Sequence, residues 1–448
     1  MLRTTTLAVA LVAALAIPSA ASAVDYPPAG NPGSGGPAAG KGKPKKLVVC
    51  KQRRCRYKTI SAAVRKARGG DTIKIRNGIY RDGVTISGPR YDGLKLIGNA
   101  KRPRKVVLNG KGLRGAKSQN GVLINNADRV TINGIYARNY KANGFFVVNV
   151  VGYKLTNLIA GKTGVYGVYA FNSKGGTMSR SQAFHNNDAG FYIGQTPPQT
   201  KPRRSIVEKV KSYGNVIGFS GTNMRYVTIR NSDFFNNGSG IVPNALESEK
   251  FPPAEHNVIS GNRVFWNNFN YYAGAPFTVP ESGPAGLPGY PIGVGILLFG
   301  SQDTTVEKNH VFGNYLAGFG AIQQIILSLE SDPKLQEAAI LRNNVVRAND
   351  FGLGGNDLNG RDMFYDGSGT GNCFADNITR SPNVPTDNST FAPCPGPAVN
   401  TLNSAAQQEG LSWVASVNKA DPNSFEKYWI RHPHAPRAGL EPLERYSR

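Results

Sequence analysis

Glycines recur every 23 residues in the first half of the chain, and a side-chain amide follows each of them five positions later. The glycines are Gly121, Gly144, Gly167 and Gly190, and the amides are Asn126, Asn149, Asn172 and Gln195. Each glycine opens a short apolar run bounded by turn residues, which is too short for a helix and typical of a strand. A strand that returns at a fixed interval predicts coils stacked roughly 4.8 Å apart, with equivalent side chains directly over one another.

Stacking gives the amide column a structural purpose. An amide carries donors and acceptors, so each one can bond its neighbour and the turn backbone, while the glycines would permit a turn with positive φ. The pattern continues, with longer loops, at Gly218 with Asn223, Gly240 with Asn244, Gly295 and Gly318. We therefore expect an all-β chain folded as a parallel β-solenoid.

The first 23 residues have the order of a secretory signal, with an apolar stretch through Ile17 and Ala-Ser-Ala before Val24. Cleavage near Ala23 would leave residues 24–46, which are rich in Pro, Gly and Lys and typical of a flexible linker. No later apolar run approaches the roughly 20 residues of a membrane span. We expect a secreted, extracellular protein without a transmembrane anchor.

Four cysteines fit an oxidising compartment. Local pairing would join Cys50 to Cys55 and Cys373 to Cys394, at opposite ends of the solenoid, where open strand edges must be covered. Other pairings and a zinc site remain open, although no histidine closely flanks either pair.

Residues 59–86 read as a short amphipathic helix, a Gly-Gly-Asp turn and alternating strands. This segment resembles the capping helix and first coil of right-handed parallel β-helix proteins, the pectate-lyase-like superfamily. The units Asn262-Arg-Val-Phe-Trp-Asn and Asn309-His-Val-Phe-Gly-Asn are similar to its generic repeat. The resemblance covers about residues 47–380 and implies a right-handed parallel β-helix with an N-terminal capping helix. Residues 381–448 would form a Pro-rich C-terminal tail.

This fold does not fix a reaction. The chain lacks the Gly-His-Gly and Arg-Ile-Lys of polygalacturonase-like hydrolases and the Arg-x-Pro-x-x-Arg of pectate-lyase-like enzymes. It also lacks the Asp-Pro-His-Asp of alginate-epimerase-like enzymes. Whether the protein is an enzyme stays open, and a polysaccharide lyase or a glycoside hydrolase would be the expected class.

Six titratable residues on three adjacent coils could supply a base and a group that neutralises a substrate carboxylate, as uronate elimination requires. These candidate catalytic residues are His185, Asp188, Glu208, Lys209, Arg225 and Asp233. Glu247, Glu249 and His256 follow in a loop, and such carboxylates could bridge Ca²⁺, the one cofactor considered. The simpler alternative makes all of them turn and surface groups. His432 and His434 form a His-x-His, and two potential ligands alone are weak evidence for a metal site.

Within these strands we expect one column of side chains to face inward: Val122, Phe145, Val168 and Phe191. An aromatic column, Phe146, Tyr169 and Tyr192, occupies the alternate strand positions. Exposed rings at one-coil spacing would form a platform that stacks on sugar faces, which makes these three residues candidate substrate-binding groups. The alternative is that a loop or the C-terminal tail covers them, because exposed apolar stripes are rare without a partner.

The net charge of +25 is concentrated at the N-terminal end. Residues 1–117 contain 25 Lys and Arg against 4 Asp and Glu, whereas residues 118–448 contain 28 against 24. Such an end should attract polyanions, which outside the cell are acidic polysaccharides or cell-wall polymers. Export and the lack of a recognition motif argue against nucleic acid. A basic linker that only maintains solubility is the alternative.

Two functions from different classes follow from these observations. The favoured one is a secreted β-helix protein that binds an acidic polysaccharide or cell-wall polymer without catalysis. The alternative is a carbohydrate-active enzyme, a lyase or hydrolase, acting on such a polymer.

Overall fold

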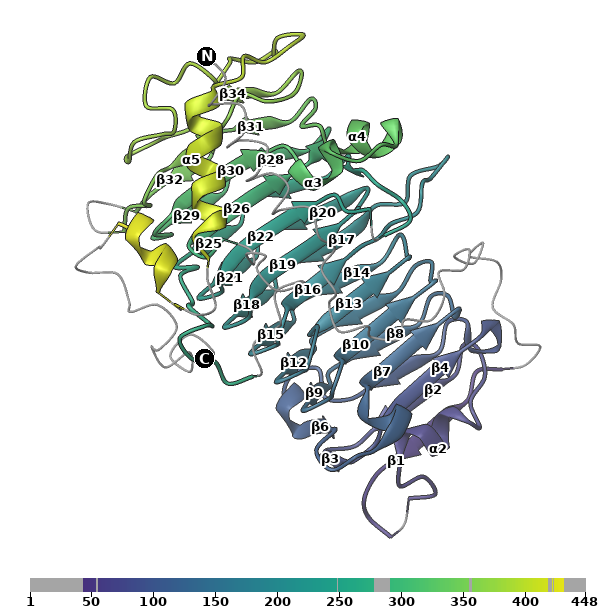
Figure 1. The fold of residues 1–448 in the computed structure, drawn as a ribbon. Coiled ribbons are helices and arrows are strands. Elements are labelled where there is room, and N and C mark those ends of the chain that lie inside the picture. Colours follow the sequence, from purple (N-terminus) through teal and green to yellow (C-terminus); the bar gives the residue numbers. More distant parts are fainter. Residues whose placement is uncertain are drawn as a thin grey trace.

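Each coil of the chain contributes one short strand to each of three long parallel sheets, which wind around a common axis (Figure 1). The computed structural model describes residues 43–53, 55–247, 249–277, 291–353, 357–417, 421 and 423–430. The predicted all-β parallel β-helix is confirmed. The predicted signal peptide, residues 1–23, and most of the predicted linker lie outside the described residues.

Sheet A has twelve strands, the most of the three sheets. In spatial order they are β1 (Lys46–Val49), β2 (Thr72–Ile75), β5 (Lys95–Ile97), β8 (Thr131–Asn133), β11 (Lys154–Thr156), β14 (Thr177–Ser179), β17 (Ser205–Glu208), β20 (Val227–Arg230), β24 (Val258–Ser260), β28 (Thr305–Glu307), β31 (Val345–Arg347) and β34 (Cys373–Ala375).

Sheets B and C have ten strands each. Sheet B contains β3 (Gly78–Tyr80), β6 (Val106–Asn109), β9 (Tyr136–Arg138), β12 (Ile159–Gly161), β15 (Gln182–Phe184), β18 (Lys211–Tyr213), β21 (Asp233–Phe235), β25 (Arg263–Phe265), β29 (His310–Phe312) and β32 (Asp350–Phe351). Sheet C contains β4 (Val84–Ser87), β7 (Asn120–Asn125), β10 (Asn143–Val148), β13 (Val168–Phe171), β16 (Ala189–Ile193), β19 (Ile217–Thr222), β22 (Ser239–Asn244), β26 (Val294–Phe299), β30 (Ala317–Ile322) and β33 (Met363–Tyr365). A small parallel pair joins β23 (Ala254–Glu255) to β27 (Ser301–Gln302).

The strand register confirms the predicted 23-residue coil. Phe145 pairs with Val122 on one side and Val168 on the other, and Val168 pairs with Phe191. All four side chains are at most 1% exposed and belong to the core that fills the helix. The predicted inward column is therefore correct.

The periodic glycines have a different role from the predicted one. Gly121 and Gly144 lie inside strands β7 and β10, and a Cβ added to Gly121 would lie 2.5 Å from the carbonyl oxygen of Gly144. Glycine is needed there because adjacent coils approach too closely for a side chain. Positive φ belongs instead to the amide column, with φ of 57° at Asn149 and 48° at Asn172.

The predicted amide column includes a ladder rung between Asn149 and Asn172. The Asn172 Nδ2 donates to the Asn149 Oδ1 at 2.7 Å, as expected for amides stacked one coil apart. On the preceding coil, the Asn126 Nδ2 donates to its chain neighbour Asn125 at 3.0 Å.

A longer amide ladder runs along the turn between sheets B and C. Its members, all 0% exposed, are Asn186, Asn215, Asn237, Asn267, Asn314 and Asn359. Successive Nδ2–Oδ1 distances are 2.9, 3.0, 3.0, 3.1 and 3.1 Å. The Asn267 Oδ1 also accepts from the Asn237 backbone N–H, and the Asn267 Nδ2 donates to the Phe234 carbonyl. Each amide thus connects two coils and satisfies a buried turn.

Similar amide ladders line the other two turns. Asn262, Asn309, Asn349 and Asn377 connect successive coils between sheets A and B, and Asn344, Asn372 and Asn400 do so between sheets C and A. Asn262 and Asn309 are the first residues of the two repeat units, Asn262-Arg-Val-Phe-Trp-Asn and Asn309-His-Val-Phe-Gly-Asn, that resemble the generic β-helix repeat.

The outer side of sheet B carries a stack of aromatic rings. Centroid separations along Phe184, Tyr213, Phe235, Phe265 and Phe312 are 5.3, 5.1, 5.0 and 4.9 Å, with interplanar angles of 18° or less. Offset-stacked rings reinforce the spacing that the amide ladders impose.

A capping helix lies beside the first coils of the solenoid, as expected (Figure 1), and a disulfide lies at the same end. Helix α2 (Ile60–Val64) begins where the Thr59 hydroxyl accepts from the Ala62 N–H at 3.2 Å, and it buries Ile60 against the first coils. The predicted disulfides Cys50–Cys55 and Cys373–Cys394 are both present.

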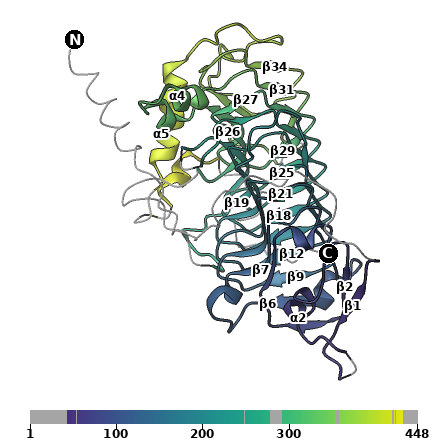
Figure 2. The ribbon, with the colours of Figure 1, turned by 90° about the vertical axis from the view of Figure 1, so that its right-hand side faces the viewer.

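The remaining helices belong to insertions and to the C-terminal segment. An insertion between β30 and β31 contains α3 (Ile325–Ser328) and α4 (Pro333–Ala339). In the predicted tail, α5 (Ser404–Ala415) packs on sheet C, where the ring centroids of Trp413 and Phe364 lie 5.0 Å apart (Figure 2). The described residues also form four short 3₁₀ helices, η1 (Pro89–Tyr91), η2 (Pro103–Lys105), η3 (Gly115–Ser118) and η4 (Ser424–Tyr428). Within the described part of the chain, no helix has the length and apolar character needed to cross a membrane.

The amide ladder between sheets B and C predicts a large stability loss on substitution. Asn267→Ala should lower the free energy of unfolding by about 2–4 kcal/mol, because it leaves the Asn237 amide without its acceptor and opens a cavity. Asn77→Ala, which removes an exposed amide, is the matched control and should cost under about 0.5 kcal/mol. Guanidinium unfolding followed by circular dichroism measures both, and equal losses would contradict the ladder's role.

Candidate functional site

Two of the predicted catalytic carboxylates form ion pairs on different sheets. Glu208, on sheet A, accepts from Arg230 with an Nη2–Oε2 distance of 2.7 Å. Asp233, on sheet B, binds Arg263 through two bonds of 2.8 and 2.9 Å. Each carboxylate is neutralised by an arginine of the neighbouring coil, so neither faces the other across a common site.

The predicted basic residues are also held by neighbouring coils. Arg225 is 4% exposed, and its guanidinium contacts the Glu255 carboxylate at 2.5 Å and the backbone carbonyls of Thr196 and Pro252. Lys209 occupies a left-handed turn position with φ of 54°. The structure therefore does not bring the six residues together, because successive parts of one coil face three directions.

His185 and Asp188 share the turn between β15 and β16. Desolvation, assisted by the charge of Lys162, lowers the pKa of His185 to about 4, so the imidazole is neutral at neutral pH. Desolvation raises the pKa of Asp188 to about 7, and a hydrogen bond with Tyr166 opposes that rise. Asp188 is thus a partly buried carboxyl that carries a proton through much of the acidic range.

Glu249 is a second carboxyl of this kind and was not among the predicted catalytic residues. The Tyr192 hydroxyl donates to the Glu249 Oε1 at 2.8 Å, and desolvation raises the pKa of Glu249 to about 8. The ring centroids of Tyr166 and Tyr192 lie 4.7 Å apart. Two carboxyls with raised pKa values therefore adjoin one tyrosine cluster outside sheet C, an arrangement that sequence spacing could not reveal because Glu249 is in an insertion.

The predicted aromatic column exists but is not an open platform. The rings of Phe146 and Tyr169 stack with centroids 4.7 Å apart and planes within 6°, and Tyr169 meets Tyr192 edge-on at 4.7 Å. The three side chains point away from the helix interior, yet they are only 2%, 1% and 4% exposed. The expectation of exposed rings is therefore wrong, and binding of sugar by these residues stays a prediction.

The N-terminal end contains a basic cavity of about 1220 Å³ around the first disulfide. Its cationic lining residues are Lys45, Lys46, Lys51, Arg56, Lys66, Lys74, Arg76 and Lys101. No acidic side chain lines it, and none of these eight cations is in an ion pair with another described residue. Eight uncompensated charges around one cavity create a field that attracts anions.

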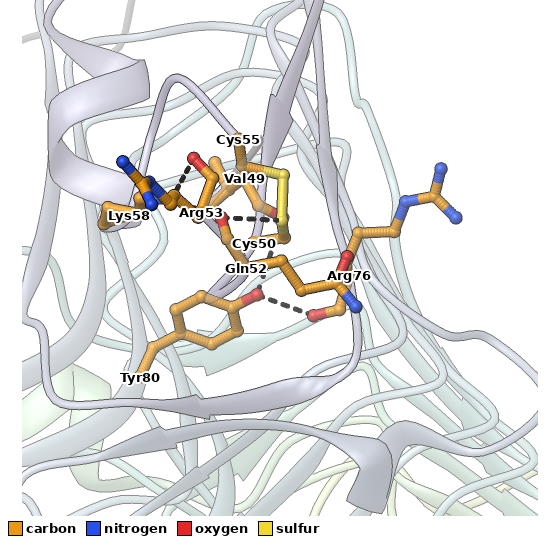
Figure 3. Close-up of a disulfide and its surroundings, with 8 residues drawn as sticks. All are labelled: Val49, Cys50, Gln52, Arg53, Cys55, Lys58, Arg76 and Tyr80. Carbon is orange, nitrogen blue, oxygen red and sulfur yellow. Dashed lines mark hydrogen bonds between the residues drawn. A yellow bond between two sulfur atoms is a disulfide. The ribbon is translucent and has the colours of Figure 1, made fainter.

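The disulfide loop that borders this cavity is fixed from two sides (Figure 3). The Lys58 ammonium donates to the carbonyls of Gln52 and Arg53, and the Tyr80 hydroxyl donates to the Val49 carbonyl, next to Cys50, at 3.5 Å. The Lys51 ammonium lies 5.0 Å from the Tyr80 ring centroid, within cation–π range. Backbone and side-chain bonds thus hold the loop while the Arg76 guanidinium extends away from the disulfide (Figure 3).

The basic surface continues from this cavity onto sheet B. Asn77 borders both the first cavity and a second one, of about 580 Å³, that is lined by Arg104, Lys105 and Arg138. The Arg104 guanidinium lies 5.5 Å from the Tyr136 ring centroid. The sequence predicted the N-terminal charge, and the fold brings Lys66 and Lys74 to the same cavity as the other cations.

Comparisons with known proteins concern the fold. The A-module of the Azotobacter vinelandii mannuronan C-5 epimerase AlgE4 is 12% identical, with a TM-score of 0.47, over 72% of this chain and 89% of that one. Alginate lyase from Paenibacillus sp. str. FPU-7 is 12% identical, with a TM-score of 0.39, over 71% and 99% of the two chains. Pectate lyase Pel9A is 14% identical, with a TM-score of 0.37, over 76% and 77%. No curated protein sequence matches the chain.

A family model described as "Right handed beta helix region" matches residues 76–245 and residues 203–391. The matched ranges overlap, together cover more than half of the chain, and contain most strands of the three parallel sheets. The chain therefore belongs to the right-handed β-helix family.

Proposed function

We propose that this protein is exported and binds an acidic polysaccharide or cell-wall polymer at the basic cavity around its first disulfide. The single observation that carries the proposal is the lining of that cavity, where eight Lys and Arg side chains meet no acidic residue. A polymer with a carboxylate on each sugar could satisfy several of these cations at once. Two disulfides in one chain support an oxidising, extracellular location.

The shape of the surface also favours a polymer over a small anion. The cavity adjoins the second basic hollow through Asn77, so cations of residues 45–138 border a continuous path at the N-terminal end of the solenoid. Tyr136, beneath the Arg104 guanidinium, lines the second hollow. Lys46 and Lys74 lie on strands β1 and β2, and the other cations of the cavity lie in the loops and turns beside them.

Neutralising cations of the cavity should weaken binding of polygalacturonate to the full chain. Lys74→Gln/Arg76→Gln/Lys101→Gln should raise the Kd at least about tenfold, equivalent to 1.4 kcal/mol. Binding by the natural sequence should weaken as NaCl rises, because the contacts are charged. Isothermal titration calorimetry measures both, with neutral dextran as the uncharged polymer.

The matched control replaces three lysines far from the cavity, Lys154→Gln/Lys308→Gln/Lys334→Gln, and should leave the Kd within about twofold of the natural value. An equal loss in both triple variants would mean that net charge alone drives binding. Equally tight binding of dextran would also reject the proposal.

A second candidate function, a polysaccharide lyase or hydrolase, rests on Asp188 and Glu249. Both carboxyls have raised pKa values, of about 7 and about 8, and so could act as general acids near neutral pH. Incubation with acidic polysaccharides, followed by ultraviolet absorbance for unsaturated uronate and a reducing-end assay, distinguishes the two functions. Product that is lost in Asp188→Asn or Glu249→Gln would favour the enzyme.

The same two carboxyls predict how stability depends on pH. Their folded-state pKa values exceed the unfolded values of about 4, so the folded state binds more protons and stability is lost as pH rises from about 4 to about 8. Glu249→Gln and Asp188→Asn should each make this pH-dependent loss of stability smaller by about 1–3 kcal/mol. Asp376→Asn, at an exposed carboxylate, is the control. Guanidinium unfolding at pH 5 and pH 8 provides the measurement, and parallel pH profiles for all variants would contradict the burial of these groups.

A further inference from the structure

The turn between sheets C and A stacks four residues in left-handed backbone positions on successive coils. Tyr226, His256, Asp303 and Asn343 have φ values of 54°, 57°, 46° and 51°. Backbone bonds fix their alignment, since the His256 N–H donates to the Gln302 carbonyl at 3.1 Å and the Asp303 N–H donates to the Arg342 carbonyl at 2.7 Å. The side chains of adjacent coils consequently lie close together at this edge.

Three metal-ligating side chains converge in this column. The His256 Nε2 lies 3.8 Å from the Glu255 Oε2, and the His256 Nδ1 lies 3.9 Å from the Asp303 Oδ2. One ligand atom from each of the three residues falls within a group whose members are all within 4.8 Å of one another. The side chains of Glu255, His256 and Asp303 are 24%, 40% and 34% exposed, so an ion could reach them from solvent.

A neighbouring side chain contacts each of the three ligand side chains and fixes its orientation. The Arg225 Nε donates to the Glu255 Oε1 at 2.5 Å, and the Asn343 Nδ2 donates to the Asp303 Oδ1 at 3.1 Å. The Tyr226 ring stacks on the His256 ring at 5.0 Å and 16°. These contacts leave the Glu255 Oε2 and the Asp303 Oδ2 directed toward the imidazole, and outer-shell contacts of this type hold ligands in metal sites.

We propose that Glu255, His256 and Asp303 bind one divalent transition-metal ion, with Zn²⁺ as the representative ion. One imidazole and two carboxylates are ligands that zinc and its neighbours accept, and three protein ligands leave a coordination position open. A hard ion such as Ca²⁺ prefers an all-oxygen set and should bind this group more weakly. The site is separate from the six predicted catalytic residues, apart from Arg225, which orients Glu255.

Binding at this position would join two coils that an insertion separates in the sequence. His256 and Asp303 lie on adjacent coils, although residues 278–290 belong to the segment between them. Arg225 additionally holds the carbonyls of Phe251 and Pro252 in the loop that precedes the site. An ion should therefore stabilise the folded state by an amount that depends on its free concentration.

The test uses the full chain after removal of metal with a chelator. Because His432 and His434 could bind zinc independently, all measurements use a His432→Ala/His434→Ala background. Titration with Zn²⁺ against a chromophoric chelator should give one equivalent bound and a raised Tm. His256→Asn and Asp303→Asn, which keep a residue that tolerates positive φ, should each raise the Kd at least tenfold and abolish the Tm increase. Asn343→Gly should raise the Kd about tenfold by freeing Asp303.

His310→Asn is the matched control, since His310 also lies near a carboxylate, with its Nδ1 3.5 Å from the Asp350 Oδ2. It should bind Zn²⁺ like the background protein. Circular dichroism of the metal-free variants separates loss of a ligand from loss of folding. Absence of stoichiometric binding, unchanged binding in both His256→Asn and Asp303→Asn, or tighter binding of Ca²⁺ than of Zn²⁺ would overturn the proposal.

Discussion

Hydrogen bonds between stacked asparagines impose the constraint on which the rest of this structure depends. A coil turns sharply at three places, and each turn buries backbone groups that no strand partner can satisfy. In the turn between sheets B and C, one amide oxygen accepts from both the side chain and the backbone of the preceding coil, as Asn267 does with Asn237. Each asparagine can bond the next one only if the two lie one strand spacing apart. The ladder therefore fixes the rise of the coils and leaves the intervening loops free to vary in length.

The variable length of these loops explains where binding or catalytic groups can gather on the molecule. Arginine–carboxylate pairs such as Glu208 with Arg230 join the outer faces of neighbouring coils and neutralise the charges there. Cations without an ion-pair partner, and titratable groups that lie close together, occur instead where the regular stacking of coils ends or is interrupted. The basic cavity lies at the first coils, the Glu249 carboxyl is in an insertion, and the Glu255, His256 and Asp303 group lies beside one.

Sequence periodicity predicted the fold because the strand and turn residues repeat wherever the coil is uninterrupted. It identified the inward column through Phe145 and Val168, the Asn149–Asn172 rung and both disulfides. It misassigned Gly121, since spacing alone cannot distinguish a glycine needed for positive φ from one needed for close approach of backbones. The aromatic stack on sheet B was overlooked because loops of unequal length separate Phe235, Phe265 and Phe312, although each ends a similar short motif.

The candidate sites were harder to predict for a geometric reason. Residues on adjacent coils are close in space only if they occupy the same position within the coil, and a shift of several residues moves a side chain to another face. Asp233 therefore lies on sheet B whereas Glu208 lies on sheet A. His256 and Asp303 are 47 positions apart, yet they share one turn position and stack directly. In a solenoid with insertions, position within the coil, rather than distance along the chain, decides which titratable groups can act together.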